Sequence, residues 1–267
     1  MPYTLAGDVE IYWESHGQGE PLLLISGVSG GTWSWEESIK ALSPYFRVMV
    51  FDNIGAGRST KPDRTYRIGE MADHAAGILD AAEVEQAYVV GLSMGGMIAQ
   101  ELALNHPQRV SRLVLGCTHC GGSERIPPAP EVIRRFADNK GLSPEEIVDK
   151  NLHLLVTPEF LQSGSELLQR YRERQVKAPW QPDYVLRRQL EAIRDFQTCD
   201  RLDRIRAPAL ILIAERDLLV PPENGRILAD RIPDADLEEF TGGHLIYLES
   251  AEAFHGTVLR FFKGLGK

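Results

Sequence analysis

The feature that most constrains this chain is one serine in a Gly-x-Ser-x-Gly frame. An apolar run ends at Gly91 and a helical pattern begins at about Met94. A serine between a strand and a helix lies on a sharp, strained turn, which needs very small residues two positions before and after it. Gly91 and Gly95 meet that need. We therefore predict that Ser93 is a nucleophile raised clear of a sheet edge; the alternative is an incidental serine in a Gly-rich turn.

The same turn predicts an anion site. The first amides of a helix lack intrahelical acceptors and lie at the positive end of the helix dipole, so the Met94 N–H is expected to stabilise an oxyanion. A second Gly-rich loop, residues 26–31, follows the apolar segment Pro21–Ile25. It offers further backbone amides at the carboxyl end of a strand, where open parallel sheets bind ligands. A merely flexible loop is the alternative.

Apolar and helical segments alternate along both ends of the chain. Val9–Glu14 alternates apolar and polar residues, as a half-buried antiparallel strand does, whereas several later segments are apolar throughout, as buried parallel strands are. Those later strands are predicted at Pro21–Ile25, Phe46–Asp52, Ala87–Gly91, Val110–Gly116 and Pro208–Ala214, with a last strand at Ala235–Phe240. Helices are predicted at Thr32–Leu42, Met71–Ala82, Met94–Asn105 and Ala251–Phe262.

Residues 117–206 break this alternation. Helical patterns occur there near Glu131–Asn139, Ser143–Leu155, Pro158–Gln175 and Asp183–Phe196, without a long apolar strand. Ser143 and Glu146 form a capping-box pattern. We predict a helical lid at 117–206, inserted between strands 6 and 7 of a core made of 1–116 and 207–267.

Three residues complete a hydrolytic constellation. A serine hydroxyl needs a base, and the base needs an acid to fix its tautomer. Ser93, Asp217 and His244 each follow a separate predicted strand, so they are expected to meet at one edge of one sheet. Their chain order is the one of α/β-hydrolases. Glu215 is the rival acid, but it lies closer to the buried end of its strand.

The chain resembles the α/β-hydrolase fold superfamily, of the lid-bearing serine esterase and lactonase type. The resemblance is carried by Leu23-Leu24-Ile25-Ser26-Gly27, Asp52-Asn53-Ile54-Gly55-Ala56-Gly57-Arg58-Ser59, Gly91-Leu92-Ser93-Met94-Gly95-Gly96, Ala214-Glu215-Arg216-Asp217 and Gly243-His244. It implies an α/β fold with a mostly parallel eight-stranded sheet, helices on both faces and a helical lid. It also implies that Val28 lends the second oxyanion amide. Many relatives carry His-Gly where this chain has Ser26-Gly27, which leaves the pose of that loop open.

These patterns predict hydrolysis of a small or medium carboxylic ester or lactone through an acyl-enzyme, without a cofactor. The resemblance keeps C–C bond hydrolysis and cofactor-free perhydrolysis as alternatives, and a ligand sensor on the same fold as a non-enzymatic one. A C–C hydrolase would need a further pocket cation, for which Arg58 is one candidate. Trp33, His119 and Trp180 are candidates for the pocket wall. The substrate and the oligomeric state stay open.

Charge and cysteine usage narrow the partners. Lys and Arg number 29 against 38 Asp and Glu, a formal charge of −9, with no basic cluster, so neither nucleic acid nor a membrane surface is expected as a partner. We expect no signal peptide and no membrane span. The odd count of three cysteines fits a reducing cytoplasm, with Cys199 isolated. Cys117-x-x-Cys120 has no second ligand pair, so no metal is expected.

Overall fold

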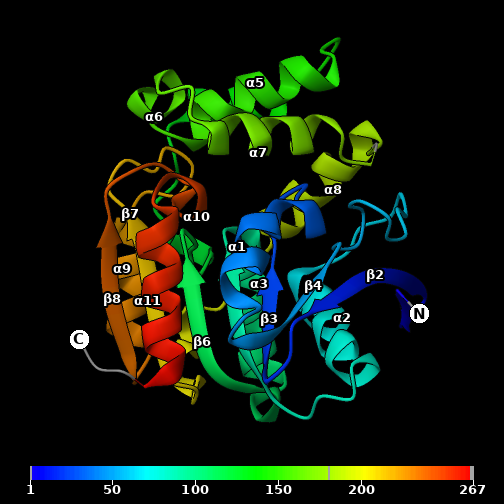
Figure 1. Ribbon diagram of the computed structural model, residues 1–267, viewed down its shortest axis with the longest axis vertical. Coiled ribbons are helices and arrows are strands. Elements are labelled where there is room, and N and C mark those ends of the chain that lie inside the picture. The colour runs from blue at the N-terminus through cyan, green and yellow to red at the C-terminus, as the bar shows by residue number, and fades with distance from the viewer. Residues whose placement is uncertain (1, 180, 265–267) are drawn as a thin grey trace.

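The computed structural model describes residues 2–179 and 181–264, which form a sheet flanked by helices (Figure 1). The strands are β1 (Tyr3–Ala6), β2 (Val9–His16), β3 (Glu20–Ile25), β4 (Phe46–Phe51), β5 (Ala87–Leu92), β6 (Val110–Gly116), β7 (Ala209–Ala214) and β8 (Ala235–Phe240). They form one eight-stranded sheet in the order β1-β2-β4-β3-β5-β6-β7-β8. Strand β2 is antiparallel to β1 and β4, and all other neighbours are parallel. The predicted mostly parallel, eight-stranded architecture is confirmed.

Helices connect these strands. The α-helices are α1 (Glu36–Leu42), α2 (Ile68–Ala81), α3 (Met94–Asn105), α4 (Pro130–Ala137), α5 (Pro144–Leu155), α6 (Pro158–Gln162), α7 (Glu166–Val176), α8 (Asp183–Arg194), α9 (Glu223–Arg231), α10 (Ile246–Glu249) and α11 (Ala251–Lys263). Short 3-10 turns are η1 (Thr32–Trp35), η2 (Pro107–Arg109), η3 (Gly122–Glu124) and η4 (Cys199–Arg204). None of the described helices combines the length and the apolar character that crossing a bilayer demands.

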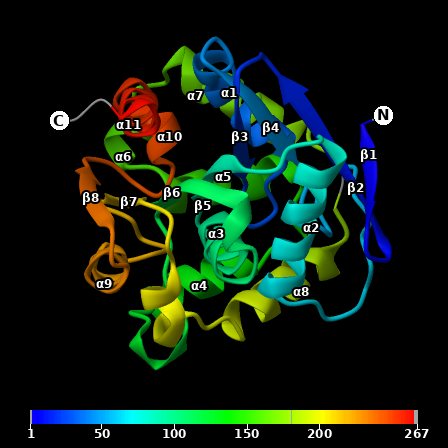
Figure 2. The ribbon, with the colours of Figure 1, turned by 90° about the horizontal axis from the view of Figure 1, so that it is seen from below.

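The central strands are apolar throughout because both of their faces are buried. Successive side chains of a strand point to opposite faces. Leu23 and Ile25 of β3 therefore join one core cluster with α2, α3 and α9. Leu22 and Leu24 join the other, with α1 and α11. Figure 2 shows these two helical layers on either side of the sheet. Burying each such leucine stabilises the fold by about 1.5–3 kcal/mol, which fixes the sheet on which the candidate site is built.

Two local predictions needed correction. The first strand, β1, was not anticipated, because it has only four residues and Leu5 in it is 70% exposed. The helix expected over Pro158–Gln175 is two helices, α6 and α7. The chain breaks at Gly164, whose φ is +55°, and the Ser165 hydroxyl then caps α7 by accepting the Leu168 N–H at 3.3 Å.

Helices α4 to α8 lie between β6 and β7 in the chain, as a helical insertion. Figure 1 shows α5, α6 and α7 on the side of the sheet to which the arrowheads of β6 and β8 point. This is the edge where the carboxyl ends of the parallel strands present their loops. The division of the chain at 117 and 206 into core and lid stays a prediction, while the placement of these helices makes them a cover for that edge.

Candidate active site

Ser93 lies between β5 and α3 in a backbone conformation that non-glycine residues rarely adopt. Its φ is +57° and its ψ is −123°. Strain of this kind amounts to about 1–3 kcal/mol and persists only where the surroundings impose it. Here the Ser93 N–H donates to the Gly116 carbonyl at 2.9 Å, and the Ser93 carbonyl accepts the Thr118 hydroxyl at 2.8 Å. Strand β6 and the residues after it thus hold the turn.

The glycines around Ser93 are required by close backbone approach. A Cβ on Gly91 would lie 2.2 Å from the Gly95 carbonyl oxygen, and one on Gly95 would lie 2.0 Å from the Ile25 carbonyl oxygen. Both distances are far inside van der Waals contact. The loop after β3 also lies against the serine, because a Cβ on Gly27 would lie 3.2 Å from Ser93 Cβ and 3.6 Å from Ser93 Oγ. The strand, helix and loop therefore meet at the serine hydroxyl.

His244 and Asp217 form a buried hydrogen-bonded pair. His244 Nδ1 lies 2.7 Å from Asp217 Oδ2, with side-chain exposures of 5% and 1%. The other carboxylate oxygen, Oδ1, accepts the N–H groups of Leu219 and Val220 at 2.8 and 2.9 Å. The rival Glu215 points to solvent. Asp217 is thus oriented by backbone on one side and fixes one ring nitrogen of His244 on the other.

Ser93 and His244 lie on loops at the same edge of the sheet, after β5 and β8. Among the described residues no hydrogen bond joins Ser93 Oγ to the imidazole, whose Nδ1 is committed to Asp217. Such contacts are often long before substrate binds and tighten in the complex. The remaining ring nitrogen, Nε2, is the one available to take the serine proton.

Sequence reasoning missed the carboxylate that holds the histidine loop. Glu249, at the end of α10, accepts the N–H of Gly243 at 3.0 Å, one residue before His244. It also accepts the N–H and the hydroxyl of Thr157, which begins α6 of the insertion. The Leu245 N–H donates to the Leu155 carbonyl at 3.0 Å. The residues on both sides of the histidine are therefore tied to the insertion.

The two predicted oxyanion donors lie beside the serine. Met94 is the first residue of α3, and Val28 follows Gly27. Within the described residues, neither amide donates to another backbone group. Ser26 donates its hydroxyl to the Gly31 carbonyl at 3.2 Å, and its own carbonyl accepts Asn53 Nδ2 at 3.0 Å. The loop is thereby closed on itself without a histidine.

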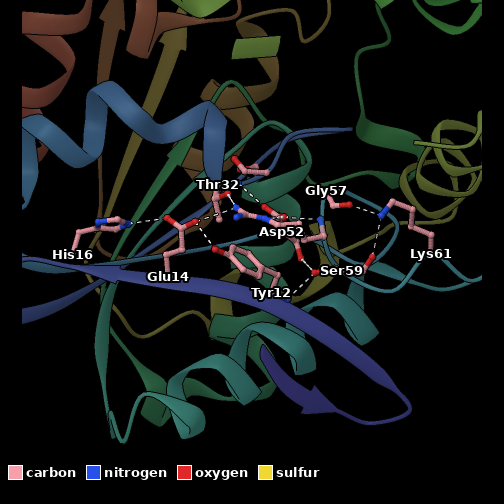
Figure 3. A network of polar contacts seen from close by, with 11 residues as sticks. Tyr12, Glu14, His16, Thr32, Asp52, Gly57, Ser59 and Lys61 are labelled. Atoms are coloured by element: carbon pink, nitrogen blue, oxygen red, sulfur yellow. Dashed lines mark hydrogen bonds and ion pairs between the residues drawn. The ribbon is translucent and has the colours of Figure 1, made fainter. Parts of the chain in front are cut away.

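A buried aspartate binds the residue that directly follows that loop, Thr32 (Figure 3). Asp52, fully buried, accepts the N–H of Thr32 at 2.7 Å and the N–H of Arg58 at 2.8 Å. The Arg58 guanidinium lies 3.4 Å from the centroid of the Tyr12 ring and donates to Glu14 and to the Thr32 hydroxyl. The Arg58 guanidinium is thus held by the Tyr12 ring, Glu14 and Thr32, so it is not the free pocket cation that a C–C hydrolase would need.

The segment Asn53–Ser59 is a structural turn and not a phosphate loop. Amides of this segment donate to carbonyls within it: the Ala56 N–H donates to the Asn53 carbonyl at 2.8 Å, and the Ser59 N–H donates to the Ala56 carbonyl at 3.1 Å. The Asp52 carboxylate beside them disfavours a phosphate. The turn instead braces the loop that carries Val28.

Cys117 lies beside the His244–Asp217 pair. Its Sγ, a carboxylate oxygen of Asp217 and a ring nitrogen of His244 all lie within 4.8 Å of one another. Burial, and then the Asp217 carboxylate, raise the pKa of the Cys117 thiol. A protonated thiol beside a histidine–aspartate pair that is already hydrogen-bonded is poorly suited to a metal ion, which needs a thiolate and free donors. The expectation of no metal therefore stays a prediction that this chemistry supports.

The expectation that Cys199 is isolated was wrong. Cys199 forms a disulfide with Cys120, across a sequence separation of 79. The pair lies at the two ends of the insertion, where Thr198 N–H also donates to the Cys120 carbonyl at 2.8 Å. Sequence spacing could not reveal this pairing, because the two cysteines meet only once β6 and β7 lie side by side. Among the described cysteines only Cys117 is free.

The predicted pocket residues have different surroundings. Trp33 is half-buried and donates its indole N–H to Gln175 of α7 at 3.1 Å, so it joins the loop after β3 to the insertion. His119 is only 2% exposed and accepts the Gly121 N–H at 3.0 Å; burial, and then Arg125, lower its pKa to about 3. It is a buried neutral histidine, and its place in the pocket wall stays a prediction. Trp180 lies outside the described residues.

Comparison with known proteins identifies the family. Residues 20–251 match the model of the alpha/beta hydrolase fold. The chain belongs to this family. It is 35% identical to "Putative carbamate hydrolase RutD" of Azorhizobium caulinodans over 264 residues, covering 98% of both chains. It is 31% identical to the poly(3-hydroxyalkanoate) depolymerase of Ectopseudomonas oleovorans, covering 91% of this chain and 84% of that one.

A solved structure shows the same arrangement of the chain. The enol-lactonase of Burkholderia xenovorans LB400 superposes with a TM-score of 0.87 at 26% identity, covering 98% of this chain and all of the other. The protein is a hydrolase of the alpha/beta fold, and a small molecule is the kind of substrate this family implies. The resemblance drawn from the sequence motifs is confirmed at the level of the fold family.

Proposed function

We propose that this protein is a serine hydrolase that cleaves a small or medium carboxylic ester or lactone through an acyl-enzyme. The observation that carries the proposal is the buried pair of His244 and Asp217, joined at 2.7 Å, at the same sheet edge as a serine on a strained elbow. A buried aspartate fixing one imidazole nitrogen leaves the other to act as a base. A hydrolase fold without this pair would have no means to activate Ser93.

The reaction then runs in two halves. Ser93 Oγ attacks the carbonyl carbon while His244 Nε2 takes the hydroxyl proton, and the carbonyl electrons move to the oxygen. The N–H groups of Met94 and Val28 stabilise that oxyanion, each by about 3 kcal/mol. His244 gives the proton to the departing alkoxide, which leaves an ester on Ser93. Water then attacks this ester while His244 takes a proton from the water. His244 next gives that proton to Ser93 Oγ as the acyl bond breaks, which releases the acid and the free serine.

A carbamate is the second candidate substrate. The identity to RutD is 35% over 98% of both chains, whereas the enol-lactonase is 26% identical. Ester, lactone and carbamate present the same acyl carbon to Ser93 and the same developing oxyanion. Arg58 is held by Glu14 and Thr32, so it does not supply the further cation that C–C bond hydrolysis would need, and an arginine of the insertion would have to take that part.

The test combines covalent labelling with a substrate panel. We expect a fluorophosphonate to add one phosphonyl group to the wild-type protein and none to Ser93→Ala, as read by intact mass. Ser93→Ala should also abolish hydrolysis of p-nitrophenyl acetate, with a melting temperature close to that of wild type. The panel holds esters and lactones of increasing acyl length, and aryl carbamates. Undiminished turnover by Ser93→Ala would remove this serine from the mechanism, and absent labelling of wild type would favour a ligand sensor.

The compartment is part of the same proposal. The cysteine count predicted a reducing cytoplasm, but the Cys120–Cys199 disulfide is typical of proteins in oxidising surroundings. Acid precipitation of cells, which freezes thiol exchange, followed by alkylation in guanidinium and intact mass, measures how many of the buried cysteines are free in place. Three labelled cysteines support the cytoplasm, and one labelled cysteine opposes it.

A further inference from the structure

The loop that carries Val28 contains a turn that a serine does not favour. Gly30 N–H donates to the Gly27 carbonyl at 3.1 Å, which closes a four-residue turn with Ser29 in its third position. Ser29 has φ +57°, and Val28 is not among the residues with positive φ. Turns that need a positive φ at the third position normally place glycine or asparagine there. The Ser29 conformation must therefore be imposed by neighbouring groups.

Two glutamines of the insertion hold Ser29 from both sides. The Ser29 N–H donates to Gln189 Oε1 at 2.8 Å, and the Ser29 carbonyl accepts Gln181 Nε2 at 3.0 Å. Gln189 is fully buried on α8, and its Nε2 donates to the Ile54 carbonyl at 3.2 Å. Both polar atoms of this side chain are thus paired, each with the backbone of a different loop of the core.

This turn sets the direction of the Val28 amide. In a trans peptide the N–H points opposite to the carbonyl of the preceding residue. The Gly27 carbonyl turns into the loop toward Gly30, so the Val28 N–H points outward, and Gly27 lies against Ser93. Without the two glutamine contacts, Ser29 leaves its positive φ either by a flip of the Val28–Ser29 peptide, which keeps the Gly27–Gly30 hydrogen bond, or by opening of the turn, which releases the Val28 amide from this direction.

We propose that Gln189 is a positioning residue that holds the Val28 amide in the oxyanion hole, so that the insertion completes the catalytic site as well as covering it. This inference rests on the proposed function. It assigns to α8 a part in stabilising the transition state. It also explains how a chain with Ser26 in place of the usual histidine keeps its oxyanion loop in place.

The test is Gln189→Met, which keeps the length of the side chain and removes both hydrogen bonds. The matched control is Gln169→Met, the same change at an exposed position of α7. We expect kcat for p-nitrophenyl acetate to fall about 10- to 100-fold in Gln189→Met, with KM little changed, because one oxyanion donor contributes a factor of about 100–1,000. The inhibition constant of an aryl trifluoromethyl ketone, which forms a tetrahedral adduct with Ser93, should weaken by a similar factor.

A rescue variant separates positioning from general stability. Glycine adopts a positive φ without strain, so Ser29→Gly in the Gln189→Met background should recover part of kcat and of the affinity for the ketone. A purely structural role would instead lower the melting temperature and the fraction of chains labelled by fluorophosphonate, and Ser29→Gly would not correct it. If Gln189→Met does not fold, Gln181→Met removes the other side of the clamp and is read by the same measurements.

The outcomes are distinct. Wild-type affinity for the ketone in the folded Gln189→Met variant, or in Gln181→Met where it is the substitute, would overturn the positioning role while the proposed hydrolase stands. A wild-type protein that neither reacts with fluorophosphonate nor hydrolyses any substrate of the panel would refute the proposed function and this inference with it. A loss confined to kcat and to the ketone, with rescue by Ser29→Gly, supports the inference.

Discussion

Removing the disulfide between Cys120 and Cys199 should destabilise the whole protein. The bond joins the residues just after β6 to the start of η4, so it closes a loop that contains the helices of the insertion. A cross-link of this kind restricts the unfolded chain more than the folded one, which is already closed at this point by the hydrogen bond from Thr198 to the Cys120 carbonyl. The perturbation is Cys199→Ser.

The size of the effect follows from the loop. For a sequence separation of 79, the chain-entropy relation gives about 15 cal/mol/K, which is about 4.5 kcal/mol at 25 °C. The unfolding entropy near the melting temperature is about 2.1 cal/mol/K per residue, or about 0.56 kcal/mol/K for 267 residues. Dividing the two gives a fall in melting temperature of about 8 °C.

The assay is thermal unfolding followed by circular dichroism, for wild type with and without dithiothreitol and for Cys199→Ser. Reduced wild type and the variant should melt at the same lower temperature. A thiol titration in guanidinium without reductant should find one thiol per wild-type chain, contributed by Cys117. Ester hydrolysis at 25 °C should persist in Cys199→Ser, since the hydrogen bonds at the base of the insertion remain.

Two results would refute the reasoning. Three titratable thiols in unreduced wild-type protein purified under oxidising conditions would show that the bond does not form. One thiol together with a melting temperature that reduction leaves unchanged would show that closing this loop contributes no stability, contrary to the entropy argument.

Further predictions follow from single residues. Ser93→Gly should abolish turnover and raise the free energy of unfolding by about 1 kcal/mol in a denaturant titration, because it releases the strain at φ +57°; a destabilised variant would contradict the strain. Asp217→Asn should lower kcat about 10⁴-fold while the melting temperature changes little, since an amide at this position holds His244 in the wrong tautomer. A near-normal kcat would show that Asp217 does not orient the catalytic histidine. Glu249→Ala should lower the free energy of unfolding by about 2 kcal/mol and reduce kcat, because the Gly243 amide loses its charged acceptor. An unchanged kcat would show that the contact between Glu249 and Gly243 does not position His244. Burial lowers the pKa of His255 from 6.5 to about 4, so between these pH values the folded state binds fewer protons than the unfolded state. The contribution of the neutral His255 to the free energy of unfolding is therefore complete above pH 6.5 and is lost as the pH falls from 6.5 through 4. Denaturant titrations from pH 7 to 4 should show a smaller loss for His255→Gln, by about 3 kcal/mol, and an equal loss in both proteins would contradict this assignment.

Much of the candidate site is local information, which is why it could be read from the sequence. The strained elbow needs only Gly91, Ser93 and Gly95 at alternate positions of one short segment, because strand, turn and helix are adjacent in the chain. Parallel strands place their carboxyl ends at one edge, so the loops that hold Asp217 and His244 were expected beside that of Ser93. Sequence reasoning preferred Asp217 to Glu215 because Glu215 lies closer to the buried end of its strand, and in the structure it is the Asp217 carboxylate that turns inward and accepts the Leu219 and Val220 amides.

The amino-acid sequence alone determined the fold family, the order of buried strands and the residues at their ends, because burial on both faces and close backbone approach leave a local record of apolar runs and glycines. Only the tertiary structure decided the pairing of Cys120 with Cys199, the grip of Glu249 on Gly243 and the clamp of Gln189 on Ser29. Gln189 joins the insertion to a core loop, Glu249 holds a core loop while it also accepts hydrogen bonds from Thr157 of the insertion, and the disulfide closes the insertion at its base. A glutamine in an amphipathic helix looks the same in sequence whether it faces solvent or a strained turn, and only the packing of the helix tells the two apart.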